Sequence, residues 1–297
     1  MEQNKSFKGK GVFANPRIDI AFKRCLGSPQ YKDATIGLLN AFIPGRNIVD
    51  VKFENVEFPR ESEDKKTIFI DIVCTDDKGA HFIVEMQRTG QPFFMQRMSY
   101  YASKVITTLD VDKGEIDYSV KPCYVIAFLD FDLAKATGMP ELGDEPSLHF
   151  VTTYFNGEKY VQHPGSPEFY YFDLTKFKKS LGESADEKEI WLTLLNESQD
   201  MLDVPQSLME NKSYTAFFEG LRQVNFTKEE TLEYFKQMTD EMCWRAALKY
   251  QKDEGRQEGK LDVARAMLAD GLGIDKVEKY TGLSKESLEA LLAEMSK

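Results

Sequence analysis

The sequence predicts an α/β fold with a mixed sheet, followed by a helical C-terminal region. Apolar residues with helical spacing open the chain, and three strand-like segments follow them. A second helical segment and another strand-like segment come next, and from residue 214 onward the pattern is almost wholly helical. The 297 residues suit one large domain, or a domain with an appendage.

Two helices are predicted before the first strand. Asn15 is a favoured N-cap and Pro16 suits the first helical position, so the first helix begins there and ends at Gly27. A second helix runs from about residue 30 to residue 43.

Alternating and β-branched segments predict the sheet. Residues 49–58 alternate apolar and polar side chains, and residues 67–74 and 81–87 are strand-like segments on either side of an Asp-Asp-Lys-Gly turn. A helix over residues 93–109 and a buried strand over residues 122–131 complete the order helix, three strands, helix, strand.

The composition of the rest of the chain indicates the end of a large domain, a linker and a C-terminal module. Two aromatic strand candidates and a helix lie in its middle, at residues 148–155, 168–174 and 186–199. Residues 251–260 are polar, contain two glycines and are typical of a flexible linker. We therefore expect one domain over residues 13–250 and a module of three short helices over residues 261–297.

Composition also argues against several classes of protein. The four cysteines lie far apart and form no C-x-x-C pair, which argues against a disulfide framework and a zinc ribbon. No stretch approaches the roughly 20 apolar residues of a membrane span, and no apolar run follows the basic N-terminus. We therefore expect a cytoplasmic protein without a membrane partner. A net charge of −11 confines any nucleic-acid site to a local group of positive side chains.

Two acidic residues mark the predicted hairpin. Asp71 interrupts an apolar strand, where an ionised carboxylate is costly unless it is paired or binds a metal ion. Glu85 and Gln87 share one face of the next strand, because side chains alternate along a strand. If the turn is a three-residue loop with glycine in the left-handed position, Asp71 lies opposite Glu85.

Directly opposed carboxylates destabilise a sheet unless a positive charge lies between them, and a divalent cation is the simplest candidate. The alternative is structural. Asp71 would then be a charge on an edge strand and Glu85 a solvated side chain. The hairpin taken by itself leaves both interpretations open.

A positive zone follows the hairpin. Residues 86–109 contain no Asp or Glu but include Arg88, Arg97 and Lys104. Arg97, Tyr101 and Lys104 share one face of the predicted helix, where they could contact phosphates and stack on bases of a nucleic acid. The alternative is an ordinary solvated helix face.

Several segments together resemble one known family. They are Asp19-Ile20-Ala21-Phe22-Lys23, Glu85-Met86-Gln87, Arg97-Met98-Ser99-Tyr100-Tyr101, Phe172-Asp173-Leu174-Thr175-Lys176-Phe177 and Thr281-Gly282-Leu283-Ser284-Lys285-Glu286. With the order of elements, they resemble the PD-(D/E)xK nuclease superfamily and, more closely, the Rpn family of recombination-promoting nucleases and transposases. The resemblance covers most of the chain.

This resemblance implies a restriction-endonuclease-like αβββαβ core and DNA cleavage that depends on Mg²⁺, Mn²⁺ or Ca²⁺. Asp71 matches the motif aspartate, Glu85 the second acid and Gln87 the position usually held by lysine. The carbonyl of Met86 would add a metal ligand, and Asp19 matches an acid on the first helix that could add another. The alternative for Asp19 is a first-turn acid favoured by the helix dipole.

The chain departs from the general PD-(D/E)xK superfamily motif at two positions. Ile70 precedes Asp71 where the motif has proline, and Gln87 stands in place of the lysine. An amide carries no positive charge and cannot accept a proton, so Gln87 could orient water only by hydrogen bonding.

The function that the sequence predicts is a metal-dependent DNA endonuclease that promotes recombination or transposition, or acts against foreign DNA. The alternative is an inactive nuclease fold that serves as a DNA- or protein-binding scaffold. Acyl-transfer and nucleotide-handling enzymes find little support, because the G-x-S-x-G, P-loop and G-x-G-x-x-G motifs are absent.

The C-terminal module resembles a helix-turn-helix. Its last helix carries Glu286, Glu289 and Glu294, which would repel phosphates. The sequence therefore favours packing, or homo-oligomer formation through these helices, over DNA reading.

Overall fold

The computed structural model describes residues 12–55, 69–110, 119–139, 146–182 and 185–295. The chain divides into two compact units, Met1–Tyr234 and Phe235–Lys297. The first unit contains a sheet and the second is helical.

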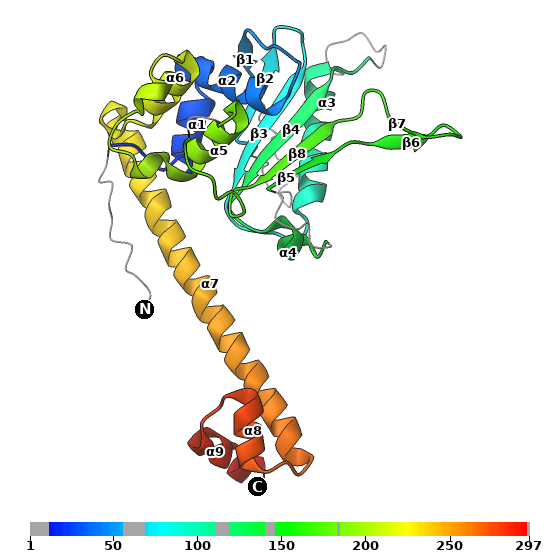
Figure 1. The fold of residues 1–297 in the computed structure, drawn as a ribbon, viewed down its shortest axis with the longest axis vertical. Coiled ribbons are helices and arrows are strands. Elements are labelled where there is room, and N and C mark those ends of the chain that lie inside the picture. Colours follow the sequence, from blue (N-terminus) through cyan, green and yellow to red (C-terminus); the bar gives the residue numbers. More distant parts are fainter. Residues whose placement is uncertain (1–11, 56–68, 111–118, 140–145, 183–184, 296–297) are drawn as a thin grey trace, which may run out of the picture. The chain divides into compact units, whose positions relative to one another are not determined.

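A six-stranded mixed sheet forms the centre of the first unit, in the order β1-β2-β3-β4-β8-β5 (Figure 1). Its strands are β1 (Val51–Phe53), β2 (Ile72–Asp76), β3 (His81–Gln87), β4 (Cys123–Leu129), β5 (Ser147–Phe150) and β8 (Glu168–Asp173). Neighbours among β1, β2 and β3 are antiparallel, β3, β4 and β8 run parallel, and β5 is antiparallel to β8. The predicted α/β class, mixed sheet and αβββαβ order are confirmed.

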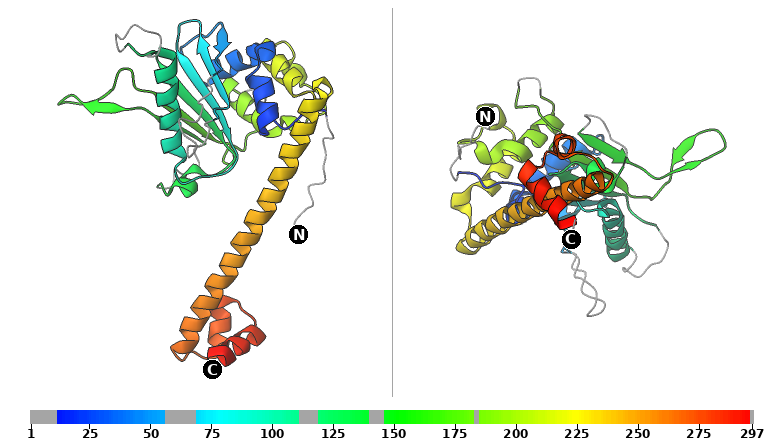
Figure 2. Two further views of the ribbon diagram at one scale, coloured as in Figure 1. Left: turned by 180° about the vertical axis from the view of Figure 1, so that it is seen from behind. Right: turned by 90° about the horizontal axis from the view of Figure 1, so that it is seen from below.

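Helices cover both faces of the sheet (Figures 1 and 2). One face packs against α3 (Phe94–Asp110), whose Met98, Ala102 and Val105 are fully buried. Four helices lie on the side of the other face: α1 (Asp19–Leu26), α2 (Lys32–Phe42), α5 (Glu187–Glu197) and α6 (Lys212–Leu221), of which α6 packs on α1 and α2. There the ring centroid of Phe42 lies 5.1 Å from that of Phe128, and buried aromatic contacts of this kind contribute strongly to a core.

The hairpin of β2 and β3 has the predicted register. Ile72 pairs with Val84 and Thr75 pairs with His81. The loop ends at Gly79, whose φ of 82° is the left-handed conformation that glycine adopts without steric cost. The same register, continued by one residue, places Asp71 opposite Glu85.

The ends of several elements differ from the prediction. The first helix begins at Asp19 because the Asn15 side chain caps only a turn, accepting a hydrogen bond from the Arg17 amide at 3.0 Å. β2 begins at Ile72, so Asp71 lies just before the strand and not within it. Residues 56–58 and 67–68, which belong to predicted strands, lie outside the described residues.

The predicted strand over residues 148–155 is divided in two. β5 joins the main sheet, whereas β6 (Thr153–Phe155) forms a separate two-stranded ribbon with β7 (Tyr160–Gln162), visible in Figure 1. All three residues of β6 are exposed, so no core contact keeps them in line with β5.

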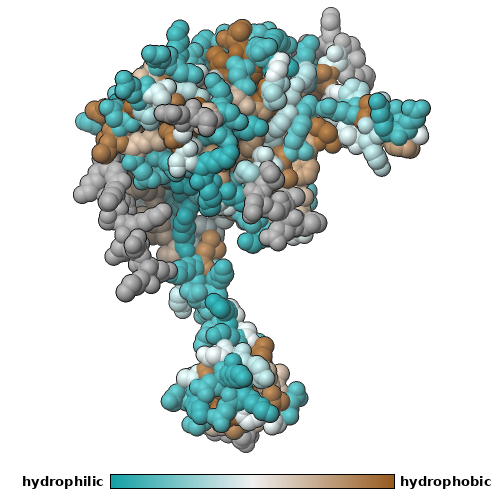
Figure 3. Space-filling model, in the orientation of Figure 1, coloured by the Kyte–Doolittle hydropathy of each residue, from teal (hydrophilic) through white to brown (hydrophobic). Residues whose placement is uncertain are grey.

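A single helix, α7 (Lys228–Ala269), includes residues 251–260, for which we expected a flexible linker. Lys, Glu, Gln and Arg dominate this stretch and are good helix formers, which offsets Gly255 and Gly259. Its residues are almost all exposed, and Figure 3 shows a mainly hydrophilic surface along α7. Within the described residues, no helix combines the length and the apolar character that crossing a membrane requires.

The second unit has a small core of its own. α8 (Ile274–Thr281) and α9 (Lys285–Met295) pack with the end of α7, so the first of the three short helices predicted for residues 261–297 is instead the end of a longer helix. The buried residues are Ala264, Leu268, Val277, Leu283, Leu288 and Leu291.

Gly220→Ala is expected to destabilise the first unit. A Cβ at Gly220 of α6 would lie 2.7 Å from the Cys25 Cα of α1, so the two helices would have to separate, at a cost of about 1–3 kcal/mol. Thermal unfolding followed by circular dichroism should show a lower Tm. The matched control is Gly255→Ala, whose Cβ meets nothing within 4 Å and which should stabilise α7 by about 0.5–1 kcal/mol. A Gly220→Ala protein as stable as the parent would contradict this close packing.

Candidate active site

Asp71 and Glu85 meet at the end of the β2–β3 hairpin. The Asp71 amide donates to Glu85 Oε1 at 3.0 Å, and the Met86 amide donates to Asp71 Oδ2 at 2.9 Å. Each carboxylate is therefore fixed by a backbone amide of the other strand. These side-chain bonds replace strand pairing at Asp71, which explains why β2 begins one residue later.

Both carboxylates are removed from water. Glu85 is only 4% exposed, and the side chain of Asp71 is 16% exposed. Burial raises the pKa of Glu85 well above its usual value, and the negative charge of Asp71 raises it further. Burial also raises the pKa of Asp71 to about 6, although the Met86 amide and the charge of Lys23 oppose this. The alternative of a solvated Glu85 is therefore wrong.

Lys23, in the last turn of α1, lies beside this pair. Its Nζ is 2.6 Å from Asp19 Oδ1 and 3.4 Å from Asp71 Oδ1. Burial lowers the pKa of Lys23, but its hydrogen bond to Asp19 and the charge of Asp71 outweigh burial, so the net shift is upward. Lys23 was not among the site residues predicted from the sequence. Its spacing of four residues from Asp19 was the available signal, because that spacing puts both on one helix face.

Arg97 of α3 approaches from another side. Its guanidinium donates to Gln87 Oε1, and to Gln91 Oε1 at 2.6 Å. It also lies over the ring of Tyr101, 5.9 Å from the centroid. The charge of Arg97 lowers the pKa of Glu85, whereas burial and then the charge of Glu85 raise the pKa of Tyr101. The structure thus brings Gln87, Arg97 and Tyr101 to the carboxylate pair.

The other two predicted DNA-binding residues contact other side chains. Lys104 Nζ lies over the ring of Tyr100, 5.7 Å from its centroid, and Tyr100 is largely exposed. Arg88 Nε is 3.9 Å from Asp130, which also pairs with Arg17 at 3.1 Å. Arg88, which directly follows the last residue of β3, therefore belongs to a second group of ion pairs.

Asp19 is linked to Asp71 through Lys23, whose Nζ contacts both carboxylates, and the negative charge of Asp19 helps to raise the pKa of Asp71. Among the residues that the structure describes, no group of three or more His, Cys, Asp or Glu side chains could hold a metal ion. A cation here would have two carboxylates and backbone carbonyl or water oxygens as ligands. Such all-oxygen sets suit Mg²⁺, Mn²⁺ and Ca²⁺.

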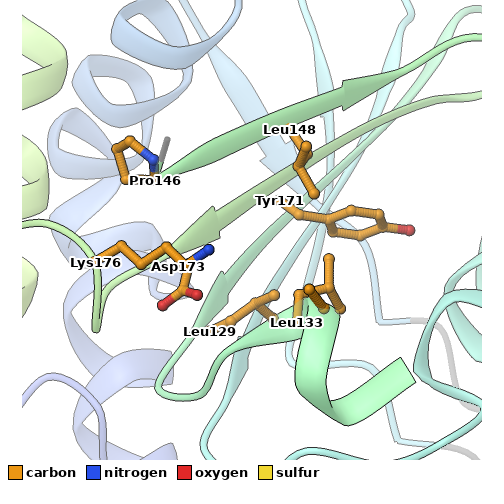
Figure 4. A pocket seen from close by; sticks show the side chains of 8 residues that line it. Leu129, Leu133, Pro146, Leu148, Tyr171, Asp173 and Lys176 are labelled. Atoms are coloured by element: carbon orange, nitrogen blue, oxygen red, sulfur yellow. The ribbon is translucent and has the colours of Figure 1, made fainter. Parts of the chain in front are cut away.

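A small cavity between α4 (Leu133–Thr137), β5 and β8 is unsuited to a substrate (Figure 4). Leu129, Leu148 and Tyr171 contribute to its walls, and its volume of about 10 Å³ is that of one water molecule. The carboxylate pair is not part of it. The carboxylate pair of Asp71 and Glu85, rather than this cavity, is the candidate active site.

Two protein families match the chain. Residues 16–251 match the family described as PD-(D/E)XK nuclease family transposase, and residues 257–293 match the one described as Rpn/YhgA-like nuclease family, C-terminal HTH domain. Comparisons with curated proteins and with solved structures found no match. Because the first match spans most of its length, the chain belongs to the PD-(D/E)XK nuclease family transposases, as its resemblance in sequence predicted.

Proposed function

We propose that this chain is a divalent-metal-dependent DNA endonuclease whose metal ligands are Asp71, Glu85 and the Met86 carbonyl. The observation that carries the proposal is the meeting of two buried carboxylates at the end of β3, with Lys23 and Arg97 beside them. Family membership supports nuclease chemistry, and the transposase description favours a role in recombination or transposition over one in defence against foreign DNA.

The donor atoms suit a hard divalent ion. The Met86 amide donates to Asp71 Oδ2, and the Asp71 amide donates to Glu85 Oε1. The metal would therefore bind through the other oxygen of each carboxylate, Asp71 Oδ1 and Glu85 Oε2. Ions such as Mg²⁺ and Mn²⁺ prefer carboxylate and carbonyl oxygens, and Ca²⁺ takes the same donors. When bound, such an ion would activate the attacking water and neutralise charge on the scissile phosphate.

Arg97 is suited to stabilising charge on that phosphate. Its guanidinium is held in place by Gln87, Gln91 and the Tyr101 ring, and a charge fixed in advance needs no reorganisation during the reaction. Gln87 also donates to the Thr89 carbonyl at 3.3 Å, so we infer that it orients Arg97 more than water. Tyr101 could stack on a base.

The other predicted residues would have supporting roles. Lys104 and Arg88 would bind the DNA backbone away from the scissile bond, and Asp19 would act on the metal only through Lys23. The helix-turn-helix description of residues 257–293 supports DNA as a partner. Homo-oligomer formation through α8 and α9 stays a prediction.

Asp71→Asn is expected to abolish metal-dependent cleavage of plasmid DNA. The amide oxygen can still accept from the Met86 amide, so the hairpin persists, but one charged metal ligand is lost. The expected fall in rate is at least about 100-fold, because a bound ion contributes several kcal/mol of charge stabilisation. Cleavage assays with Mg²⁺ or Mn²⁺ on plasmid and single-stranded DNA would measure it. Asp50→Asn is the matched control, since Asp50 is exposed and pairs with Lys32.

Cleavage by the Asp71→Asn protein at the parent rate would remove the assignment. DNA binding that is indifferent to metal, in a parent protein that never cleaves, would favour the inactive scaffold instead.

Glu85→Gln is expected to stabilise the metal-free protein at pH 8. The pKa of Glu85 is raised in the folded state. At a pH between its unfolded-state and folded-state pKa, the folded chain holds a proton that the unfolded chain has lost. The free energy of unfolding therefore falls as pH rises across this range. The amide removes this penalty, although Asp71, Lys23, Arg97 and Tyr101 still surround it. Thermal unfolding in EDTA should show a Tm raised by at least about 2 °C at pH 8 and by less at pH 5.

The same variant tests metal binding without any cleavage assay. Mn²⁺ should raise the Tm of the parent at pH 8, since a ligand that binds only the folded state stabilises it, and should leave the Glu85→Gln protein unchanged. Equal stabilisation of both proteins by Mn²⁺ would place the metal elsewhere.

A further inference from the structure

The motif position on β3 has no positive charge. Gln87 holds the place where the family motif has lysine, and both ends of its amide are engaged, one by Arg97 and the other by the Thr89 carbonyl. Any cation that acts on the phosphate at this site therefore comes from another element. The neighbouring helices α1 and α3 each supply one, Lys23 and Arg97.

These two cations differ in freedom of movement. The Arg97 guanidinium bonds to Gln87 and Gln91 and lies over the rings of Phe94 and Tyr101, 5.5 and 5.9 Å from their centroids. Arg97 is therefore held in one place. The lysine side chain is unbranched, and its ammonium can rotate its three donors between acceptors.

Lys23 stands on the solvent side of the carboxylate pair. Its side chain is 36% exposed, compared with 16% for Asp71, whereas Glu85 is buried. Its Nζ nevertheless reaches Asp71 Oδ1 at 3.4 Å, and its charge also acts on Glu85. A phosphate that enters from solvent toward Asp71 and Glu85 would thus meet the ammonium of Lys23.

We propose that Lys23 takes the role of the missing motif lysine by donating a hydrogen bond from its ammonium to a non-bridging oxygen of the scissile phosphate. This inference rests on the proposed endonuclease function. In the metal-free chain the same ammonium neutralises Asp71 and Asp19. With a divalent ion held by Asp71 and Glu85, Lys23 would no longer be needed to neutralise Asp71, and its ammonium could donate to the phosphate. Lys23 forms and breaks no covalent bond in this role.

The test compares Lys23→Gln with the parent in the full-length chain. At saturating Mn²⁺ the rate of plasmid cleavage should fall at least about 100-fold, as expected when one charge-stabilising donor is removed. The Kd for Mn²⁺ alone, measured by isothermal titration calorimetry, should stay the same or decrease, because a competing cation has left Asp71. The matched control is Lys32→Gln, since Lys32 forms an exposed pair with Asp50 at 2.7 Å and should change neither quantity.

A second variant tests whether the position of the charge on the chain matters. Gln87→Lys, added to Lys23→Gln, restores a cation on the strand face that carries Glu85, so cleavage should recover at least about tenfold over Lys23→Gln alone. If Lys23 had only a structural role, a lysine at position 87 of β3 could not substitute for it.

Three results would overturn the inference. They are parent-like cleavage by Lys23→Gln, a Kd for Mn²⁺ that rises tenfold or more in that variant, and no recovery in the double variant. A parent protein that binds Mn²⁺ but cleaves no DNA would instead reject the endonuclease function, and the role of Lys23 with it. Whether the parent protein cleaves DNA therefore distinguishes a failure of the Lys23 inference from a failure of the proposed endonuclease function.

Discussion

The burial of two like charges side by side is the constraint on which the rest of the site depends. Asp71 and Glu85 each accept a backbone amide of the opposite strand, so neither can turn away without breaking the hairpin end. Charges buried in this way must be protonated, or compensated by a cation. The positive side chains of α1 and α3 meet that need, and a divalent ion would meet it more fully.

This constraint links the site to helices on both faces of the sheet. α3 places Arg97 beside the pair, and the same helix buries Met98 and Val105 against the strands. α1 places Lys23 there, and its position is fixed by α6, where Arg24 bonds to the Gly220 carbonyl at 3.1 Å. A change in helix packing would therefore move a charge at the site, which couples stability to function.

Local chemistry made part of this arrangement predictable. The Asp-Asp-Lys-Gly turn and the alternation of side chains were sufficient to place Asp71 opposite Glu85, because both rules act over a few residues. The position of Lys23 could not be derived in this way. Lys23 is 48 residues from Asp71 in sequence, and its place beside Asp71 depends on how α1 docks in the fold. Arg88 shows the opposite error: it is close to Gln87 in sequence, yet its partner is Asp130. The helical state of residues 251–260 was missed because two glycines were given more weight than the helix formers around them.

On the proposed role of Lys23, the difference between carboxylates and cations would explain why the acidic half of the motif stays on the hairpin while the cation can come from another element. Metal ligands must present oxygens at defined distances and angles, so their positions are tied to strand geometry. A positive charge acts on a phosphate through space, and its effect depends on where the charge lies and how well it is shielded from water. A long lysine side chain on α1 can deliver that charge as well as one on β3 can. An amide at Gln87 is then compatible with hydrolysis, provided that α1 keeps Lys23 within reach of the site.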